Sequence, residues 1–323
     1  MKPVVSIITP TWNRGLYLEK VWESLKSQSY QNFEWIIGND GSTDDTCARV
    51  KNFSEKSSFP ITIISASLRI GKSRMDNEAV RIAKGEFILF CDSDDYLLSN
   101  ALEMLTNTWN SISENEKDEF SGVTALCDSN NGILDKMYPG SKYTDIKLND
   151  LLSKMQFDMV LFGRADELKK NPFKEVDYLI SETSVWNIIG VKKTRYIPVP
   201  LVYKNYGSDN CISYSGLMEY NRGKAYAMSA SKSVNSSSNM TIKKTLWRLI
   251  TYIRYCIHGE INIVDAWRMW GVKGIEMMHV FIVFPLAIIL SIKDQIQGKV
   301  RKTHRNYLKA EKEVQIKVEM YNT

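Results

Sequence analysis

The first hundred residues alternate short apolar runs with segments of helical spacing. The apolar runs predict strands at Val4–Thr9, Phe33–Gly38, Pro60–Ala66 and Glu86–Cys91. Helical spacing predicts helices between them, at Tyr17–Ser27, Asp44–Asn52 and Lys72–Ala83. Strands with little polar alternation, separated by helices, indicate a mostly parallel sheet that is covered on both faces. We therefore predict an α/β fold, doubly wound around such a sheet.

Beyond residue 105 the pattern is weaker. It predicts a strand at Ser121–Cys127, helices at Leu148–Met155 and Ser181–Ile189, and an extended segment at Arg195–Tyr203. Residues 229–240 are rich in serine and predict a linker. The expected organisation is one half-domain over residues 1–105, a second over 106–228, this linker, and a helical region over 241–323.

The charge of the chain is uneven. The chain has 42 Lys/Arg and 37 Asp/Glu. From Thr241 onward there are 14 Lys/Arg and 7 Asp/Glu, so this region has a net charge of +7, and residues 1–240 have a net charge of −2. Met277–Ile292 has no charged residue, but it is shorter than the roughly 20 residues of a spanning helix, and Pro285 interrupts it. Upstream, Thr241–Met269 mixes tryptophans with Lys and Arg, which is typical of helices that lie in a membrane interface.

We therefore predict a C-terminal helical region that associates with an anionic membrane surface. A further basic helix is predicted at Lys299–Lys317. The alternative is an ordinary pair of helices that packs against the rest of the protein.

Composition narrows the compartment, the chemistry and the partners that we expect for this protein. The five cysteines are scattered without a Cys-x-x-Cys pair, which suits a reducing compartment. Met1-Lys2-Pro3 leads directly into a β-branched run, so no export signal is predicted. All three histidines lie beyond residue 257, which excludes histidine chemistry from the first two hundred residues. No base-reading module is present, so nucleic acid is not an expected partner. A cytoplasmic location follows.

Polar residues cluster where three of the predicted parallel strands end. The sequences are SIITPTWN at Ser6–Asn13, a strand ending in NDGS at Asn39–Ser42, and FILFCDSDD at Phe87–Asp95, and a fourth polar segment opens the helix at Gly71–Asn77. Open α/β sheets bind their ligands at the carboxyl ends of the strands. The four segments are therefore candidates for one ligand site.

The carboxylates of Asp92, Asp94 and Asp95 repel one another unless a positive charge lies among them. Carboxylate oxygens are ligands that Mg²⁺ and Mn²⁺ prefer. The alternative is an acidic turn before a helix at Leu97–Leu105. Asp40 can accept a hydrogen bond from the N3–H of uracil, or it can belong to a simple turn.

Together the four segments resemble the family 2 glycosyltransferases, inverting enzymes of the GT-A fold that use nucleotide-diphospho-sugars. The resemblance covers residues 3–110 and, more weakly, 170–215. It implies a UDP-sugar donor and Mn²⁺ or Mg²⁺ held by Asp94. The donor-binding residues that it implies are Thr9, Pro10, Trp12, Asn13, Asp40, Lys72, Arg74, Asp92 and Ser93. Two positions depart from the family: Asp76-Asn77 replaces Arg-Asn, so the cation is expected from Lys72 or Arg74, and Trp12 replaces Tyr or Phe.

The resemblance also implies a general base. The family places an acidic residue at a helix start, four residues before a tryptophan, and Glu182 holds that position before Trp186. The alternative is that Glu182 only stabilises the start of a helix through the helix dipole. Asp177 and Asp158 are then the next candidates for the general base.

The implied function is the transfer of a sugar from a UDP-sugar to a hydroxyl of a lipid-linked or oligosaccharide acceptor, at the inner face of the cell membrane, in surface polysaccharide synthesis. An inactive nucleotide-sugar-binding or adaptor protein and a nucleotidyltransferase on a related fold are the alternatives.

Overall fold

The computed structural model divides the chain into two units. Unit 1 comprises residues 1–175, 182–211 and 309–323, and unit 2 comprises 176–181 and 212–308. The structure describes residues 2–129, 143–154, 158–175, 182–205, 218–219, 242–259, 261–262, 264–266, 277–297, 300–301 and 314–322. The predicted linker at 229–240 and the candidate base Asp177 lie outside these residues.

Unit 1 is built on a ten-stranded mixed sheet whose order is β12-β3-β2-β1-β4-β8-β6-β9-β5, with β7 paired to β9. The strands of its first half are β1 (Val5–Thr11), β2 (Phe33–Asn39), β3 (Ile61–Ala66) and β4 (Phe87–Phe90). These four strands are parallel to one another, with β1 between β2 and β4. The predicted parallel sheet is thus confirmed for the first hundred residues.

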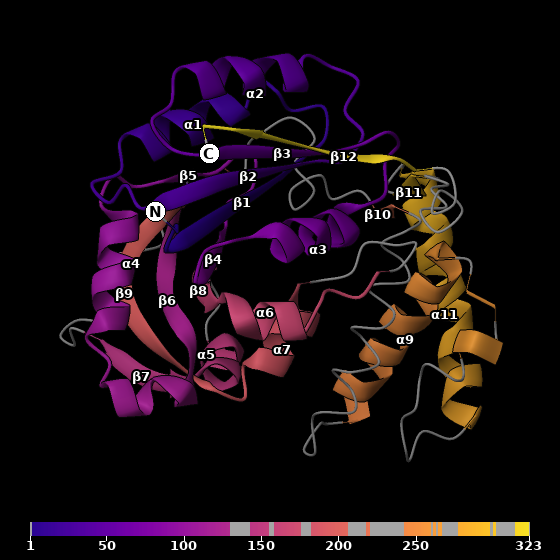
Figure 1. Ribbon diagram of the computed structural model, residues 1–323. Helices are drawn as coiled ribbons and strands as arrows, with labels where there is room; N and C mark the ends of the chain where they lie inside the picture. The colour runs from indigo at the N-terminus through magenta and orange to yellow at the C-terminus, as the bar shows by residue number, and fades with distance from the viewer. Residues whose placement is uncertain are drawn as a thin grey trace. The chain divides into compact units, whose positions relative to one another are not determined.

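Helices cover both faces of this sheet. On one face, α1 (Leu18–Lys26), α2 (Thr46–Glu55) and α4 (Ala101–Asn110) pack on one hydrophobic cluster. On the other face, α3 (Lys72–Ile82) and the later helices α5 (Leu148–Lys154), α6 (Ala165–Lys170) and α7 (Thr183–Ile189) pack on a second cluster. Figure 1 shows α1 and α2 on one side of the first strands and α3 on the other. The predicted doubly wound arrangement is confirmed.

The second half of the sheet is largely antiparallel. Its strands are β5 (Tyr96–Leu97), β6 (Phe120–Ser129), β7 (Thr144–Lys147), β8 (Met159–Arg164) and β9 (Lys193–Lys204). β8 lies between β4 and β6 and is antiparallel to both, while β6 and β9 are parallel. β8 and α6 were not predicted, because the apolar run at Met159–Phe162 is too short for its pattern to distinguish a buried strand from part of a helix.

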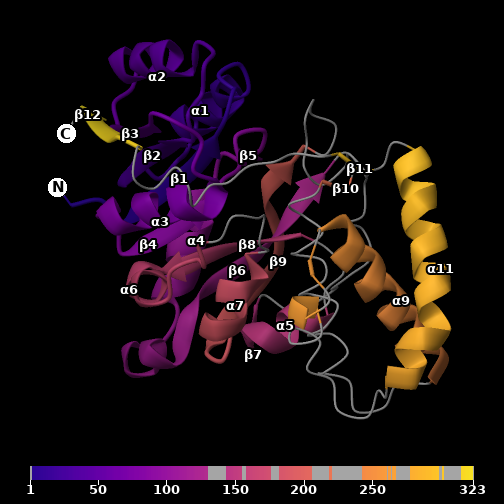
Figure 2. The same ribbon diagram turned by 90° about the vertical axis from the view of Figure 1, so that its right-hand side faces the viewer.

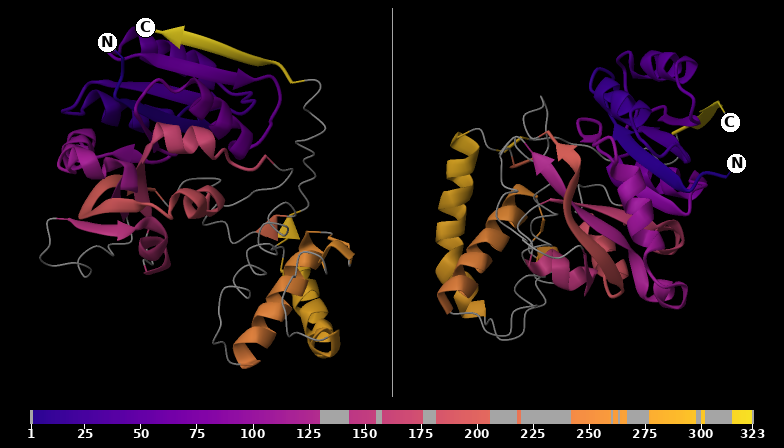
Figure 3. Two further views of the ribbon diagram at one scale, coloured as in Figure 1. Left: turned by 60° about the horizontal axis from the view of Figure 1, so that its bottom comes forward. Right: turned by 90° about the vertical axis from the view of Figure 1, so that its left-hand side faces the viewer.

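The sheet ends on a strand from the far end of the chain. β12 (Ile316–Tyr321) pairs antiparallel with β3, with Ile316 opposite Ala66 and Tyr321 opposite Ile61. Figure 3 shows this strand in yellow beside the first strands of the chain. The helix predicted over Lys299–Lys317 is therefore wrong for its last residues, which alternate apolar and charged side chains as a half-buried strand does.

Unit 2 contains two helices that pack side by side, α9 (Ile242–His258) and α11 (Met277–Ile296) (Figure 2). Their interface is apolar and includes Tyr252 and Ile253 of α9 and Val283 and Ala287 of α11. Asp294 lies at the same interface, where it pairs with Arg254 and His258. Two short strands, β10 (Met218–Glu219) and β11 (Val300–Arg301), pair in this unit. In the described parts of the chain, no helix is both long and apolar enough to cross a membrane.

Candidate active site

The carboxyl ends of the first parallel strands bring the predicted motifs together. Thr11 at the end of β1 lies opposite Asn39 at the end of β2, and the Asp40 amide donates to the Thr11 carbonyl at 2.9 Å. On the other side of β1, the Cys91 amide donates to the Ile8 carbonyl at 2.9 Å. The segments that follow β1, β2 and β4 therefore share one edge of the sheet, as the sequence predicted.

Asp40 anchors the loop between β3 and α3. Its Oδ1 accepts from the amides of Ile70 and Gly71 at 2.6 and 3.0 Å, and its Oδ2 is 3.3 Å from Nε of Arg69. The guanidinium of Arg69 in turn stacks on the ring of Trp12 at 3.8 Å. The side chains of Asp40, Arg69 and Trp12 therefore form one packed group at the ends of β1 and β2. The predicted hydrogen bond from Asp40 to uracil remains a prediction.

Gly41, in the turn after β2, allows the backbone of the loop between β3 and α3 to lie close to it. Its φ is +70°, and a Cβ there would lie 2.7 Å from the backbone of Leu68 and Arg69. Only glycine adopts this conformation and this contact without strain.

The acidic segment after β4 is held by two basic side chains from distant parts of the chain. Asp94 pairs with Arg14, from the loop after β1, at 2.9 Å. Lys204, at the end of β9, contacts Asp92 at 3.1 Å and Asp95 at 2.6 Å. The three carboxylates of this segment are therefore close to positive charge in the absence of any ligand.

Lys72 connects this segment to the predicted base. Its Nζ lies 2.6 Å from Oε1 of Glu182, 2.8 Å from Oδ2 of Asp76 and 3.9 Å from Oδ1 of Asp92. Lys72 and Asp76 are one turn apart on α3, and Glu182 directly precedes α7. The structure thus brings the predicted base to the same edge as the acidic segment.

Burial and neighbouring charges shift the pKa values of this cluster in opposite directions. Lys204, with Lys72 on the other side, holds the pKa of Asp92 well below its ordinary value. Burial raises the pKa of Asp95 to about 7, even though Lys204 opposes the shift. Burial likewise raises the pKa of Asp76 to about 7. Burial would lower the pKa of Lys72, but Asp76, Glu182 and Asp92 outweigh it and raise that pKa well above its ordinary value.

The cluster has more acidic than basic groups. Its carboxylates are those of Asp76, Asp92, Asp94, Asp95 and Glu182, and its cations are those of Arg14, Lys72 and Lys204. With all eight groups ionised, the formal charge is −2. A divalent cation bound here would neutralise that charge.

The side-chain oxygens of this cluster suit such a cation only in part. In the described residues, no group of three or more His, Cys, Asp or Glu side chains is arranged to hold a metal. Mg²⁺ is commonly bound by one or two carboxylates together with substrate phosphates. The oxygens of Asp94 and Asp92 therefore fit a cation that a diphosphate helps to hold, and they do not form a complete protein site.

The other predicted residues lie in several environments. Thr9 is fully buried, and its hydroxyl accepts from Nε1 of Trp35 at 2.9 Å, so its side chain belongs to the core. Asn13 is exposed and bonds the loop after β2, where its Oδ1 accepts from the Thr43 amide at 2.7 Å.

Pro10 is half-buried in β1, and Ser93 is buried between the two aspartates. Arg74 is half-buried, and its Nη1 has no hydrogen-bond partner in the described part of the chain.

Asp158, a substitute candidate for the base, is exposed just before β8.

Three residues of the site were missed from the sequence: Arg14, Arg69 and Lys204. Each is a single basic residue outside the recognised motifs. Arg14 directly follows Asn13, and Arg69 lies two residues before Gly71, which was a usable signal. Lys204 carried no such signal, because its approach to Asp92 depends on how β9 joins the sheet.

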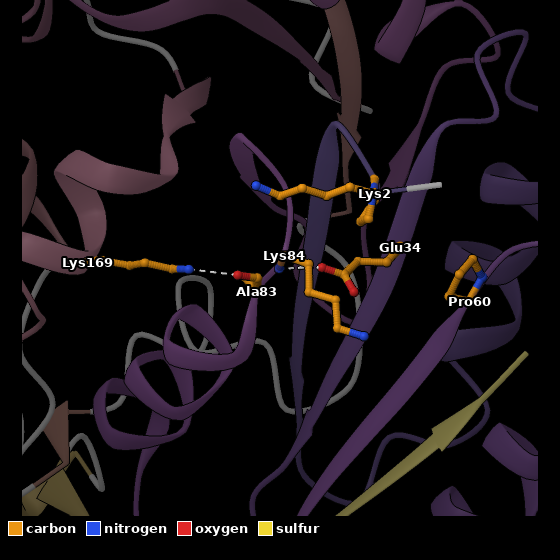
Figure 4. Close-up of a pocket in the computed structure, with 7 residues that line it drawn as sticks. Lys2, Glu34, Pro60, Ala83, Lys84 and Lys169 are labelled. Atoms are coloured by element: carbon orange, nitrogen blue, oxygen red, sulfur yellow. Dashed lines mark hydrogen bonds between the residues drawn. The ribbon is translucent and has the colours of Figure 1, made fainter. Parts of the chain in front are cut away.

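A cavity of about 480 Å³ lies at the opposite edge of the sheet, at the amino ends of the first strands. Figure 4 shows its lining, in which Lys84 and Lys169 approach Glu34 and Ala83. Glu34 is buried, and its Oε1 accepts from the Ser6 hydroxyl at 2.6 Å and the Lys84 amide at 2.7 Å. This cavity is remote from the charged cluster, and its carboxylate is satisfied by the protein.

Comparison with known proteins identifies the fold and a family that this chain resembles. Residues 6–163 match the family model of Glycosyl transferase family 2. A crystal structure of S. aureus TarS in complex with UDP-GlcNAc superposes with a TM-score of 0.53, at 18% identity, over 91% of this chain and 81% of that one. Residues 6–163 therefore resemble a family 2 glycosyltransferase domain, and the fold is the GT-A fold.

Two curated relatives are similar to part of this chain. The chain is 30% identical to the GalNAc(5)-diNAcBac-PP-undecaprenol beta-1,3-glucosyltransferase of Campylobacter jejuni, over 60% of this chain and 62% of that protein. It is 32% identical to the UDP-Glc:alpha-D-GlcNAc-diphosphoundecaprenol beta-1,3-glucosyltransferase WfgD of Escherichia coli, over 45% and 54%. The matches thus span less than two thirds of these relatives.

Proposed function

We propose that this protein is an inverting glycosyltransferase that moves a sugar from a UDP-sugar to a hydroxyl of a lipid-linked glycan. The observation that carries the proposal is the cluster at the carboxyl edge, where Lys72 joins the candidate base Glu182 to the acidic segment at Asp92. Base and acidic segment must be neighbours if one substrate sugar is to lie between them.

In this proposal the acceptor oxygen attacks the anomeric carbon of the donor, and the bond from that carbon to the diphosphate breaks. The electron pair leaves with UDP, and the acceptor proton passes to Glu182. Arg14 and Lys204 lie beside the acidic segment, where positive charge stabilises the departing diphosphate. Mn²⁺ or Mg²⁺, when held by Asp94 and the diphosphate, supplies further positive charge to the leaving group.

The substrate classes come from the relatives. The TarS structure contains UDP-GlcNAc, and a mannosyltransferase structure with a TM-score of 0.50 contains GDP-Man and Mn²⁺. The names of the Campylobacter and Escherichia relatives specify undecaprenol-linked diphosphates. These names favour a nucleotide-diphospho-sugar donor, a divalent cation and an acceptor on a polyprenyl diphosphate, in the synthesis of a surface polysaccharide.

The experiment that tests this function is a donor panel. The purified chain is incubated with nucleotide-sugars, Mn²⁺ and an undecaprenyl-diphosphate-linked sugar, and free UDP is measured. We expect UDP release from one or a few UDP-sugars, increased by the acceptor. An intact chain that binds UDP but releases none from any donor would indicate an inactive binding protein, and release of diphosphate would indicate a nucleotidyltransferase.

We further propose that unit 2 brings the enzyme to the anionic inner face of the cell membrane. The side of α11 that faces away from α9 is apolar and exposed; its residues are Ile282, Leu286, Ile289, Ile292 and Ile296. Their spacing of three or four residues forms one stripe along the helix. Lys293 lies on the exposed surface beside this stripe, where it can contact lipid phosphates.

The membrane proposal is tested by sedimentation with anionic vesicles. The full chain should bind them, and binding should weaken as salt rises. The double substitution Ile289→Glu with Ile296→Glu should abolish binding, whereas Val191→Glu, at an exposed apolar residue of unit 1, should not. A full chain that stays in the supernatant at low salt would refute the proposal. Truncation before unit 2 is unsuitable, because it also removes β12 from the catalytic sheet.

A further inference from the structure

Asp76 is an acidic residue inside the catalytic unit that the proposed reaction does not use. Its side chain is 1% exposed, and its Oδ2 accepts from Nζ of Lys72 at 2.8 Å. Burying a carboxylate costs free energy unless a charged partner compensates it. The position of Asp76 therefore requires an explanation other than surface solubility.

The partner of Asp76 is also the contact of the base. Lys72 Nζ donates to Oε1 of Glu182 at 2.6 Å, and within the described part of the chain this is the hydrogen bond that holds the Glu182 carboxylate. Glu182 is itself 39% exposed and belongs to no regular element, since α7 begins one residue later. A half-exposed glutamate has several rotamers in water, so its direction depends on Lys72.

Lysine alone is a poor means of fixing a direction. Its ammonium ends a flexible four-carbon chain. In this structure it also lies 3.9 Å from Asp92, where the proposed diphosphate would compete for it. Asp76 counteracts this competition, because it is fixed in the core on the same helix, one turn from Lys72.

We propose that Asp76 is a positioning residue, whose carboxylate fixes Lys72 so that Lys72 fixes the base Glu182 beside the donor. This inference rests on the proposed function, and it changes the expected role of Lys72 from a donor contact to a support of the base. Oε1 of Glu182 is occupied by Lys72, and Oε2 is left to accept the proton of the acceptor hydroxyl. When that proton arrives, Lys72 loses one anionic partner and retains Asp76.

The first test separates turnover from donor binding. Asp76→Asn keeps the shape and removes the charge, and Glu78→Gln, on the same helix and paired with Arg81, is the matched control. We expect Asp76→Asn to lower kcat for UDP release about 10- to 100-fold, because a misdirected catalytic group costs that much. The KM for the donor should change less than about threefold, and the control should match the wild type.

A double-mutant cycle shows whether Asp76 acts through Lys72. In a Lys72→Met background, adding Asp76→Asn should change kcat less than about twofold, because the connection is already broken. The double variant leaves no buried carboxylate at position 76 without a partner, so it can be compared with Asp76→Asn if Lys72→Met alone fails to fold. Additive effects of the two substitutions, or a loss of donor affinity in proportion to kcat, would overturn the inference.

The last test needs no turnover. The rate at which acetic anhydride acylates Lys72 is measured by mass spectrometry on the protein without substrate. Removing the Asp76 charge lowers the pKa of Lys72, so Asp76→Asn should raise the acylation rate at least about threefold, and Glu78→Gln should not. An unchanged rate would overturn the inference whatever the enzyme's activity, whereas a wild type that releases no UDP from any donor would overturn only the proposed function.

Discussion

The two edges of the ten-stranded sheet differ in how their charged groups are paired. At the amino edge, a cavity of about 480 Å³ surrounds a single buried carboxylate, that of Glu34, whose hydrogen bonds come from Ser6 and Lys84. At the carboxyl edge, five carboxylates share three cations, and two of them, Asp76 and Asp95, have pKa values raised to about 7. The carboxylate of the amino edge is satisfied by the protein, and the carboxyl edge has more carboxyl groups than basic groups.

This difference favours the carboxyl edge as the functional edge more strongly than the cavity favours the amino edge. A buried polar group with all its partners stabilises the fold, whereas perturbed pKa values cluster at sites that bind or react. Substitutions at the carboxyl edge should therefore reduce activity more than stability, and those at the amino edge should do the reverse.

The largest effect is expected at Glu182. Glu182→Gln keeps the contact with Lys72 but is a far poorer proton acceptor, so kcat should fall roughly 10²- to 10⁴-fold. UDP affinity should stay the same, because the base contacts the acceptor. Steady-state kinetics and UDP titration distinguish these quantities, and a parallel loss of UDP affinity would place Glu182 in the nucleotide pocket.

A smaller effect is expected at Gly41. Gly41→Ala puts a Cβ against the backbone of Leu68 and Arg69 at a φ of +70°. The strain should cost about 1–3 kcal/mol and displace the loop that Asp40 anchors. We expect UDP affinity to fall about tenfold by titration calorimetry. An alanine variant with wild-type UDP affinity would show that this loop is not part of the donor site.

At the amino edge, we expect a substitution to reduce stability and to leave activity unchanged. Glu34→Leu leaves the Ser6 hydroxyl and the Lys84 amide without their acceptor, which should destabilise the protein by about 1–3 kcal/mol. Thermal unfolding measures this loss. Below the melting temperature, kcat and donor KM should equal those of the wild type; a tenfold loss of kcat would show that the two edges are not functionally separate.

The smallest effect concerns pH. Because the pKa of Asp76 rises to about 7 in the folded protein, its protonated form contributes stability that is lost as pH increases from about 4 to 7. Because Asn does not titrate, the Asp76→Asn variant does not show this loss of stability with rising pH. The melting temperature of the variant relative to wild type should therefore be a few degrees higher at pH 8 than at pH 5. A difference that shrinks with pH would mean that pairing with Lys72 outweighs burial.

The sequence predicted the first half of the fold well and the second half poorly. β1 to β4 are continuous apolar runs separated by helices, and they pair in parallel with one another, so local pattern and topology agree. β8 and β12 join the sheet through pairings that depend on distant residues. In β12, the alternation of Ile316, Val318 and Met320 with charged residues was a readable strand signal.

The same distinction holds for the site. Asp40, Asp92, Asp94 and Glu182 were predicted because each belongs to a motif. Lys204 was not, because the pairing of β9 with β5, in which Tyr203 lies opposite Tyr96, brings it to Asp92 and Asp95. Thr9 was assigned to the donor pocket by its motif, whereas its side chain bonds Trp35 in the core.

The central claim is that the carboxyl edge binds a nucleoside diphosphate together with a divalent cation at Asp94. The most direct measurement is calorimetric titration of UDP, with and without Mn²⁺, into the wild type and Asp94→Asn. We predict that Mn²⁺ strengthens UDP binding by the wild type at least about tenfold and leaves binding by Asp94→Asn unchanged, with equal melting temperatures and no turnover in the variant. Mn²⁺-dependent UDP binding of equal strength in both proteins would contradict the claim.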